Sequence, residues 1–126
     1  MAAPTIASRL RRRFILLSED RALERELRAA LPEGWEMVAT TDLDEIGGFE
    51  ELLQYRFLLL DLDRPGTDPM TAIEHVRRDL MLNLAIVCLG GEQGLRDRAR
   101  RARADRFYPR AEAVVAMQAF CAQFGW

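Results

Sequence analysis

One stretch of the sequence decides the fold: Phe57-Leu58-Leu59-Leu60-Asp61-Leu62, which runs directly into Asp63-Arg64-Pro65-Gly66-Thr67-Asp68-Pro69. Its first part is almost continuously apolar, as expected for a central parallel strand that is covered on both faces. Its second part is a run of turn-forming residues that ends the strand. The carboxylate of Asp61 therefore falls at the carboxyl end of a buried strand.

Short apolar strands and helical patterns alternate on both sides of this stretch. Strands are predicted at residues 14–17, 35–39, 57–62, 84–89 and 105–108, and helices at 23–31, 43–53, 70–80, 95–102 and 111–124. In the second helix, capped by Asp42, the apolar face is expected to consist of Leu43, Ile46, Phe49 and Leu53. Regular alternation with short joints predicts an α/β fold, in which five parallel strands form a doubly wound sheet with helices on both faces.

The composition fits one domain of 126 residues, of which 49% are hydrophobic and 30% are charged. All 18 basic residues are arginines, which excludes Schiff-base and phosphate-loop lysine chemistry. A single histidine, His75, gives little support to a zinc site or a Ser-His-Asp triad. Two cysteines without metal-binding spacing are typical of a reducing, cytoplasmic location, and no apolar run approaches the roughly 20 residues that span a bilayer.

The net charge of −2 hides an uneven distribution. Residues 1–13 carry four arginines and no acid, residues 92–106 carry six arginines and three acids, and the remaining residues carry eight arginines and 17 acids. We therefore predict a basic tail at residues 1–11 and one domain at residues 12–126. An acidic domain with two basic patches suits a protein partner, and we expect it to bind neither nucleic acid nor a membrane.

Polar residues gather where the predicted strands end. In an open parallel sheet the functional crevice lies at the carboxyl ends of the strands. Those ends are Ser18-Glu19-Asp20, the turn that begins at Asp61, Gly90-Gly91 and Pro109-Arg110. The sequence therefore places its candidate site at this edge of the sheet.

This pattern resembles the receiver domains of bacterial two-component response regulators, which have the CheY-like, flavodoxin-like (βα)5 fold. The resemblance spans residues 12–124, and its most specific part is the apolar strand, the aspartate at its end and the proline four residues later. It implies that Asp61 stands at the phosphoacceptor position, where a carboxylate can attack a phosphoryl group if a divalent cation neutralises the charge. It also implies switch positions at Ser18, Gly90, Phe107 and Arg110.

Three of these positions depart from the usual residues of the family. Receivers end their first strand in two adjacent acids that hold Mg²⁺, whereas this chain has Ser18-Glu19. The family's hydroxyl residue after the fourth strand is Gly90, and its lysine is Arg110. At the aromatic switch position, Phe107 is similar to the family. With one acid fewer, Glu19 and Asp61 would form at best a weak Mg²⁺ site.

The register of the first loop has an alternative. Aligning Glu19-Asp20 with the two acids would turn Glu24, instead of Leu23, toward the core, so the Ser18-Glu19 register is preferred. In either register Arg110 keeps a positive charge, and its planar guanidinium can grip a carboxylate at two points. We therefore expect a standing ion pair between Arg110 and Asp61.

Two interpretations as a receiver follow: a domain that still accepts phosphate inefficiently, or a pseudo-receiver that signals through binding alone. Three simultaneous substitutions favour the second. The predicted function is a receiver-like signalling domain of a two-component phosphorelay, not an enzyme, that binds a histidine kinase or another signalling protein. The family also suggests a homodimer through the fourth helix, fifth strand and fifth helix. Because the sequence ends soon after that helix, we expect no output domain within it, and it fits both a single-domain regulator and a piece of a longer protein.

Two further classes of function remain as alternatives. One is a small flavodoxin-like ligand-binding domain or enzyme. It would need a phosphate-binding loop after the first strand, where Ser18-Glu19-Asp20 would repel anions. The other is a purely structural interaction domain, for which Asp61 would have no role in signalling or partner binding.

Overall fold

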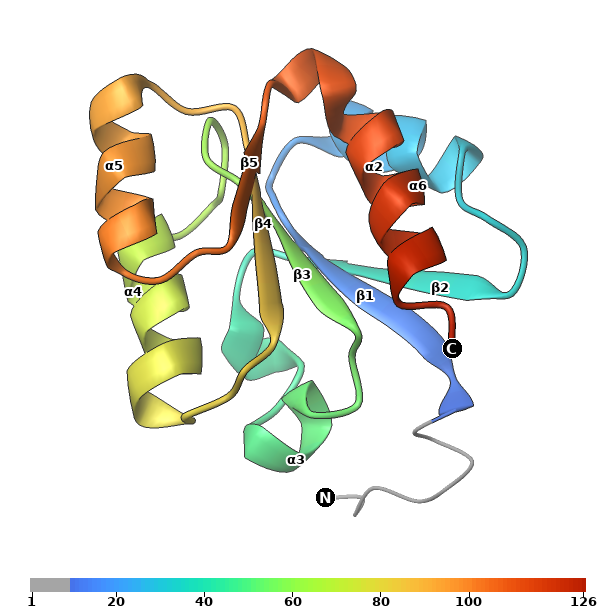
Figure 1. The fold of residues 1–126 in the computed structure, drawn as a ribbon, viewed down its shortest axis with the longest axis horizontal. Coiled ribbons are helices and arrows are strands. Elements are labelled where there is room, and N and C mark those ends of the chain that lie inside the picture. Colours follow the sequence, from blue (N-terminus) through green and yellow to red (C-terminus); the bar gives the residue numbers. More distant parts are fainter. Residues whose placement is uncertain (1–9) are drawn as a thin grey trace.

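Five parallel strands form one sheet in the order β2-β1-β3-β4-β5 in the computed structural model, which describes residues 10–126 (Figure 1). The strands are β1 (Arg12–Leu17), β2 (Trp35–Thr40), β3 (Phe57–Asp61), β4 (Ala85–Leu89) and β5 (Arg106–Tyr108). Each neighbouring pair of strands runs parallel. The predicted doubly wound α/β fold is therefore confirmed. Residues 1–9 of the predicted tail lie outside the described part of the chain.

Helices follow the strands along the chain, one α-helix after each strand. They are α2 (Arg21–Ala29), α3 (Phe49–Leu52), α4 (Pro69–Glu74), α5 (Gln93–Arg101) and α6 (Ala113–Gln123). Beyond α4 the chain continues in a π-helical turn, His75–Asp79, and two short 3₁₀ turns lie at Leu43–Glu45 and Arg110–Glu112. None of the helices within residues 10–126 is long and apolar enough to cross a membrane.

The sheet buries a separate core on each face, because side chains alternate along every strand. On one face, α2 and α6 pack over strand residues that include Phe14, Leu16, Phe57 and Leu59. On the other face, α4 and α5 pack over strand residues that include Ile15, Leu58, Leu60 and Ile86. Every residue of β3 is buried, as expected for a central strand. Asp61, the last residue of β3, is thereby held at the carboxyl edge with no exposed surface.

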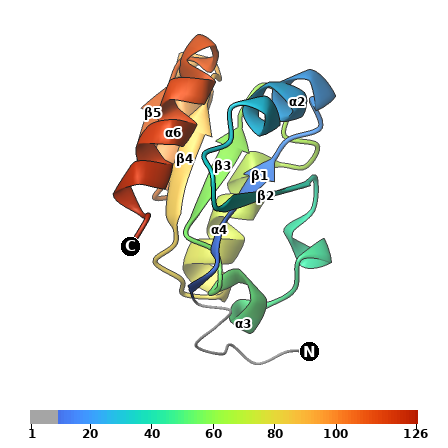
Figure 2. The same ribbon diagram turned by 90° about the vertical axis from the view of Figure 1, so that its right-hand side faces the viewer.

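The predicted helix over residues 43–53 is wrong in its extent. The chain makes a 3₁₀ turn at Leu43–Glu45 and then the single-turn helix α3, which lies at the opposite end of the sheet from the site (Figure 2). Gly47 separates the two turns because its φ of +135° is incompatible with a helix. As a consequence Leu52 is fully buried, whereas Phe49 and Leu53, expected in the core, remain 48% and 44% exposed.

A buried arginine ties together three segments at that same end of the sheet. The Arg77 side chain is only 8% exposed, and its Nη2 atom lies 2.7 Å from Oδ2 of Asp105. Its Nη1 atom donates to the carbonyl oxygens of Leu82 and Leu84, and its Nε atom donates to the carbonyl oxygen of Arg103. Arg77 therefore fixes the π-helical turn after α4, the approach to β4 and the turn between α5 and β5.

Candidate functional site

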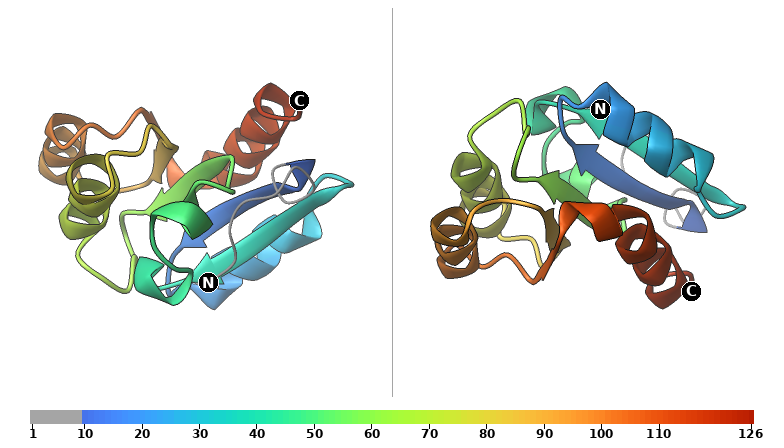
Figure 3. Two further views of the ribbon diagram at one scale, coloured as in Figure 1. Left: turned by 90° about the horizontal axis from the view of Figure 1, so that it is seen from below. Right: turned by 90° about the horizontal axis from the view of Figure 1, so that it is seen from above.

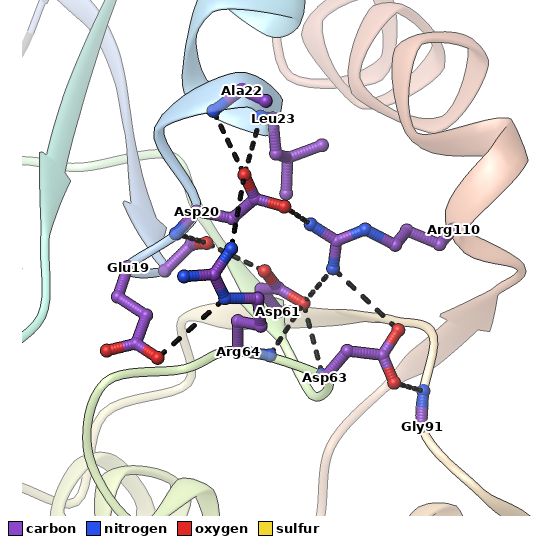
Figure 4. Close-up of polar contacts among 10 residues, drawn as sticks. Glu19, Asp20, Ala22, Leu23, Asp61, Asp63, Arg64, Gly91 and Arg110 are labelled. Carbon is purple, nitrogen blue, oxygen red and sulfur yellow. Dashed lines mark hydrogen bonds and ion pairs between the residues drawn. The ribbon is translucent and has the colours of Figure 1, made fainter.

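Asp61 is the centre of a polar network at the carboxyl edge of the sheet (Figure 4). Its Oδ1 atom accepts hydrogen bonds from the backbone N–H groups of Asp63 (3.1 Å) and Arg64 (3.3 Å). Its Oδ2 atom accepts a hydrogen bond of 2.7 Å from the hydroxyl of Ser18, which itself is 8% exposed. Both carboxylate oxygens are therefore occupied, and the carboxylate is removed from solvent.

Arg110 adds the charged partner to this network. It begins the 3₁₀ turn Arg110–Glu112 directly after β5 and the intervening Pro109, so its side chain reaches across the carboxyl ends of the strands. Its Nη1 atom lies 2.5 Å from Oδ1 of Asp61 and 3.7 Å from Oδ2 of Asp63, and its Nη2 atom contacts Oδ2 of Asp20. The ion pair expected between Arg110 and Asp61 is thus present, and it extends to two further carboxylates.

The charges around Arg110 also set its protonation. Burial of the guanidinium acts against the charged form. The hydrogen bond to Asp61 and the charges of Asp61, Asp20 and Asp63 outweigh this effect, so the pKa of Arg110 is raised above its ordinary value. The surrounding carboxylates therefore favour the charged form of Arg110.

Asp20, which the sequence analysis placed at this edge of the sheet without including it among the site residues, belongs to the network. Its Oδ1 atom caps α2 by accepting hydrogen bonds from the N–H groups of Ala22 and Leu23, and its Oδ2 atom faces Arg110. The preferred register of the first loop is consistent with this position, because Leu23 is buried at 4% exposure. A helix cap needs only one carboxylate oxygen, so the same side chain can serve both the helix and the site.

The position of Asp20 predicts a pH dependence of stability. Its hydrogen bond from Leu23 lowers its pKa below the usual 3.8, assisted by the bond from Ala22 and by Arg110 and Arg64, and opposed by burial. Since the folded-state pKa is the lower one, the stabilisation is present above the unfolded-state pKa and is lost as the pH falls through the folded-state value. We expect thermal unfolding between pH 6 and about pH 3 to show a smaller acid-induced loss for Asp20→Asn than for the native chain. Equal acid sensitivity of the two proteins would contradict this role.

Asp63 connects the network to the loop after β4. Its Oδ1 atom accepts a hydrogen bond of 3.0 Å from the backbone N–H of Gly91. Its Oδ2 atom occupies the space beside Gly90, where a Cβ atom would come within 2.1 Å of it. The sequence analysis read Asp63 as a turn former, and nothing in its local sequence indicates contact with a loop 28 residues away.

The remaining predicted positions lie around this centre without joining it. Glu19 is about half exposed, and its Oε1 atom lies 3.8 Å from Nε of Arg64, away from Asp61 (Figure 4). Phe107 is partly buried on β5 beneath the guanidinium of Arg100, 4.6 Å from the ring centre. Gly90 follows β4 and donates its N–H to the carbonyl of Tyr108. Within residues 10–126, no three His, Cys, Asp or Glu side chains form a group suited to hold a metal ion.

Comparisons by sequence give no assignment. No model of a known protein family matches the sequence. No curated protein matches it either. The proteins that this chain resembles are therefore found by comparing structures.

Several solved structures share the fold. A signal receiver domain from Bermanella marisrubri superposes with a TM-score of 0.72 at 16% identity, covering 90% of this chain and 98% of the other. The receiver domain of a sensor histidine kinase from Pseudomonas aeruginosa, with a magnesium ion in its active-site cleft, gives 0.70 at 16% identity and covers 91% and 98%. A phosphorylated cyanobacterial phytochrome response regulator gives 0.70 at 16% identity and covers 90% and 93%. This chain therefore has the CheY-like fold of response regulator receiver domains.

Proposed function

We propose that this chain is a receiver-type signalling domain of a two-component system in which a permanent contact between Arg110 and Asp61 replaces aspartyl phosphorylation. The single observation that carries the proposal is the state of Asp61, which is fully buried with both carboxylate oxygens engaged. Such a domain acts by binding other proteins rather than by catalysis.

A carboxylate nucleophile needs a free oxygen lone pair and an open approach to the phosphorus atom. Oδ1 of Asp61 faces three donors, namely Arg110 and the backbone N–H groups of Asp63 and Arg64, and Oδ2 faces the Ser18 hydroxyl. Attack would require Arg110 or Ser18 to leave first. Breaking a charge-assisted contact in a desolvated site is costly, so phosphotransfer to Asp61 is disfavoured.

The residues at this site do not suit Mg²⁺ while Arg110 is in place. Mg²⁺ requires oxygen ligands in near-octahedral geometry at about 2.0–2.1 Å. The guanidinium instead contacts Asp20, Asp61 and Asp63, the carboxylates that a cation near Asp61 would use. Glu19 faces Arg64, so the metal ligands predicted from the sequence, Glu19 and Asp61, point to different partners. We therefore infer that Mg²⁺ binds this chain weakly, if it binds at all.

The switch position after β4 supports the same proposal. Gly90 has a φ of +70°, a left-handed conformation that residues with a side chain rarely adopt, and Asp63 fills the space beside it. A serine or threonine at this position would be strained and would clash with Asp63. A hydroxyl that moves toward a phosphoryl group therefore cannot be accommodated by this loop as it stands.

The proposal is tested by adding beryllofluoride, a phosphoryl mimic, with millimolar Mg²⁺ to ¹⁵N-labelled protein. We expect no change in the amide resonances of Asp63, Arg64 and Gly91, because Arg110 and Ser18 block Asp61. A phosphorylatable receiver domain, treated in parallel, provides the positive control. The matched variant Ser18→Asp/Arg110→Lys restores two family residues and should respond more strongly than the native chain.

Slow-exchange shifts of those three amides in the native chain would refute the pseudo-receiver and leave a phosphorylatable receiver in its place.

The alternative of a nucleotide- or flavin-binding domain gains no support from the loop after β1. That loop carries the carboxylates of Glu19 and Asp20, and their negative charges oppose a phosphate group.

A further inference from the structure

An apolar cavity of about 670 Å³ lies at the amino end of the sheet, the end that Figure 3 shows from below in its left view. It opens between the turn after α3, the segment that leads into β4 and the residues that follow α6. Leucines and aromatic side chains form most of its lining, among them Leu53, Leu82, Phe124 and Trp126. Sites for small molecules are typically mostly apolar and have volumes of about 300–1,000 Å³, so the cavity has the size and character of a binding site.

The single turn of α3 leaves this end of the core uncovered. The helix ends at Leu52, and residues 53–56 lead directly into β3. Leu52 has no exposed surface, whereas the adjacent Leu53 is 44% exposed and Trp126, on the other side of the cavity, is 73% exposed. Large apolar side chains that remain exposed beside an apolar cavity mark a surface that a ligand can cover.

Two buried arginines hold the backbone on either side of the cavity. On one side, Nη1 of Arg77 donates to two carbonyl oxygens of the segment that leads into β4. On the other side, Nη1 of Arg56 donates to the carbonyl oxygens of Phe124, at 2.6 Å, and Trp126, at 2.7 Å. Because both walls are fixed before a ligand arrives, binding requires little ordering of the protein.

The wall of the cavity carries positive charge. Arg56 is part of the lining, and its guanidinium lies 3.9 Å from the centre of the Trp126 ring. Behind the wall, the guanidinium of Arg13 lies 4.7 Å from the centre of the Tyr55 ring. Burial lowers the pKa of Arg56, and the nearby charge of Arg12 lowers it further. Among residues 10–126, those that line the cavity include neither Asp nor Glu, so an anion would meet no acidic side chain there.

We propose that this cavity binds a small apolar carboxylate, with its hydrocarbon body between the leucines and aromatic rings and its acidic head toward Arg56 and the exposed amide of Asn83. Charge complementarity selects an anion, and the apolar lining selects a ligand with an apolar body. Alkyl acids and aromatic acids share this chemistry. The cavity and Asp61 lie at opposite ends of the sheet, so the inference goes beyond the proposed function and does not depend on it.

Two other occupants of the cavity are less favoured. A second copy of the chain would bring the same arginines toward each other, because a two-fold interface pairs a surface with itself. Residues 1–9 contain Arg9 and no acid, so their side chains offer no negative charge to the wall of the cavity. Both occupants are outcomes of the test.

The test is an NMR titration of the ¹⁵N-labelled full chain with decanoate and, separately, with 2-naphthoate. We expect shifts of the backbone amides of Tyr55 and Asn83 and of the indole N–H of Trp126. The amides of Asp63 and Gly91, at the opposite end of the sheet, should not shift. Acetate has only the acidic head and decyltrimethylammonium has the opposite charge, so neither should shift the cavity resonances at the same concentration. A response to only one of the two acids would identify the ligand as alkyl or aromatic.

Variants locate the binding site. Leu53→Asp removes apolar contact and adds a negative charge beside the cavity, so it should weaken binding by about tenfold or more. Phe49→Asp is the matched control, because Phe49 is a similarly exposed apolar residue of α3 that does not line the cavity, and binding should stay within about twofold of the native chain. If Leu53→Asp does not fold, Trp126→Ala, at a largely exposed position, should also weaken binding.

Several results would overturn the inference: no shift with either acid, equal shifts with decyltrimethylammonium, equal weakening by Leu53→Asp and Phe49→Asp, a dimer in sedimentation that Leu53→Asp dissociates, or binding that appears only after residues 1–9 are deleted. None of these results bears on Asp61. Beryllofluoride binding, in contrast, would refute the pseudo-receiver and leave the titration with the two acids unaffected, so the two failures are distinguishable.

Discussion

Replacing Arg110 with alanine should lower the free energy of unfolding by about 2–3 kcal/mol, measured by urea denaturation. The substitution leaves Asp61 fully buried without its charged partner, and it leaves Asp20 and Asp63 facing it across the vacated space. This expected loss of stability is smaller than the loss on breaking a fully buried ion pair, because the guanidinium is 28% exposed and Asp61 keeps three hydrogen bonds from other groups.

The same variant should become sensitive to divalent cations. Without the guanidinium, Asp20, Asp61 and Asp63 form an uncompensated group of carboxylates, so millimolar Mg²⁺ should stabilise Arg110→Ala more than it stabilises the native chain. Arg110→Lys keeps a point charge but cannot contact two carboxylates at once. We expect its free energy of unfolding to lie between those of the native chain and Arg110→Ala. An alanine variant as stable as the native protein would show that the Arg110 contact contributes little.

Replacing Arg77 with alanine should cost about 3 kcal/mol of unfolding free energy. The change removes a donor from three carbonyl oxygens and the charged partner of Asp105, at a side chain that is only 8% exposed. Because Arg77 holds the Arg103 carbonyl, amide hydrogen exchange should also accelerate in the turn between α5 and β5.

Two variants separate the contributions of charge and geometry at Arg77. Arg77→Lys keeps the charge near Asp105 but cannot reach three carbonyl oxygens at once, so it should lose about half as much stability as alanine. Arg78→Ala, at the exposed neighbouring position, serves as the control and should change stability by less than about 0.5 kcal/mol. Equal losses of stability for Arg77→Ala and Arg78→Ala would contradict the conclusion that Arg77 holds these three segments together.

Much of the architecture could be predicted because the apolar pattern is strong where the sheet is buried. The uninterrupted run in β3 has no exposed face, so its length and its terminal aspartate indicated a central strand. The helix over residues 43–53 could not be predicted as reliably. Its apolar spacing is helical, but the pair Gly47-Gly48 allows a backbone turn that local spacing does not reveal.

The candidate site was predictable only in part. The Arg110–Asp61 contact could be predicted because the resemblance to receiver domains placed the two opposite charges at the same edge of the sheet, one at the end of β3 and one after β5. Asp20 and Asp63 were missed because each has a sufficient local explanation, as a helix cap and as a turn residue. Only the three-dimensional structure shows that each carboxylate has a second oxygen directed at a residue far away in the chain.

The central claim is that the Arg110 guanidinium holds its place at Asp61 whether or not a divalent cation is available. The most direct measurement is the ¹⁵N NMR spectrum of the arginine side chains, with Arg110 assigned by substitution, before and after addition of millimolar MgCl₂. We predict separate, slowly exchanging Nη resonances for Arg110, because the group is anchored at Asp20 and Asp61, and no change on adding Mg²⁺. A single averaged Nη resonance, or loss of the separate resonances when Mg²⁺ is added, would contradict the claim.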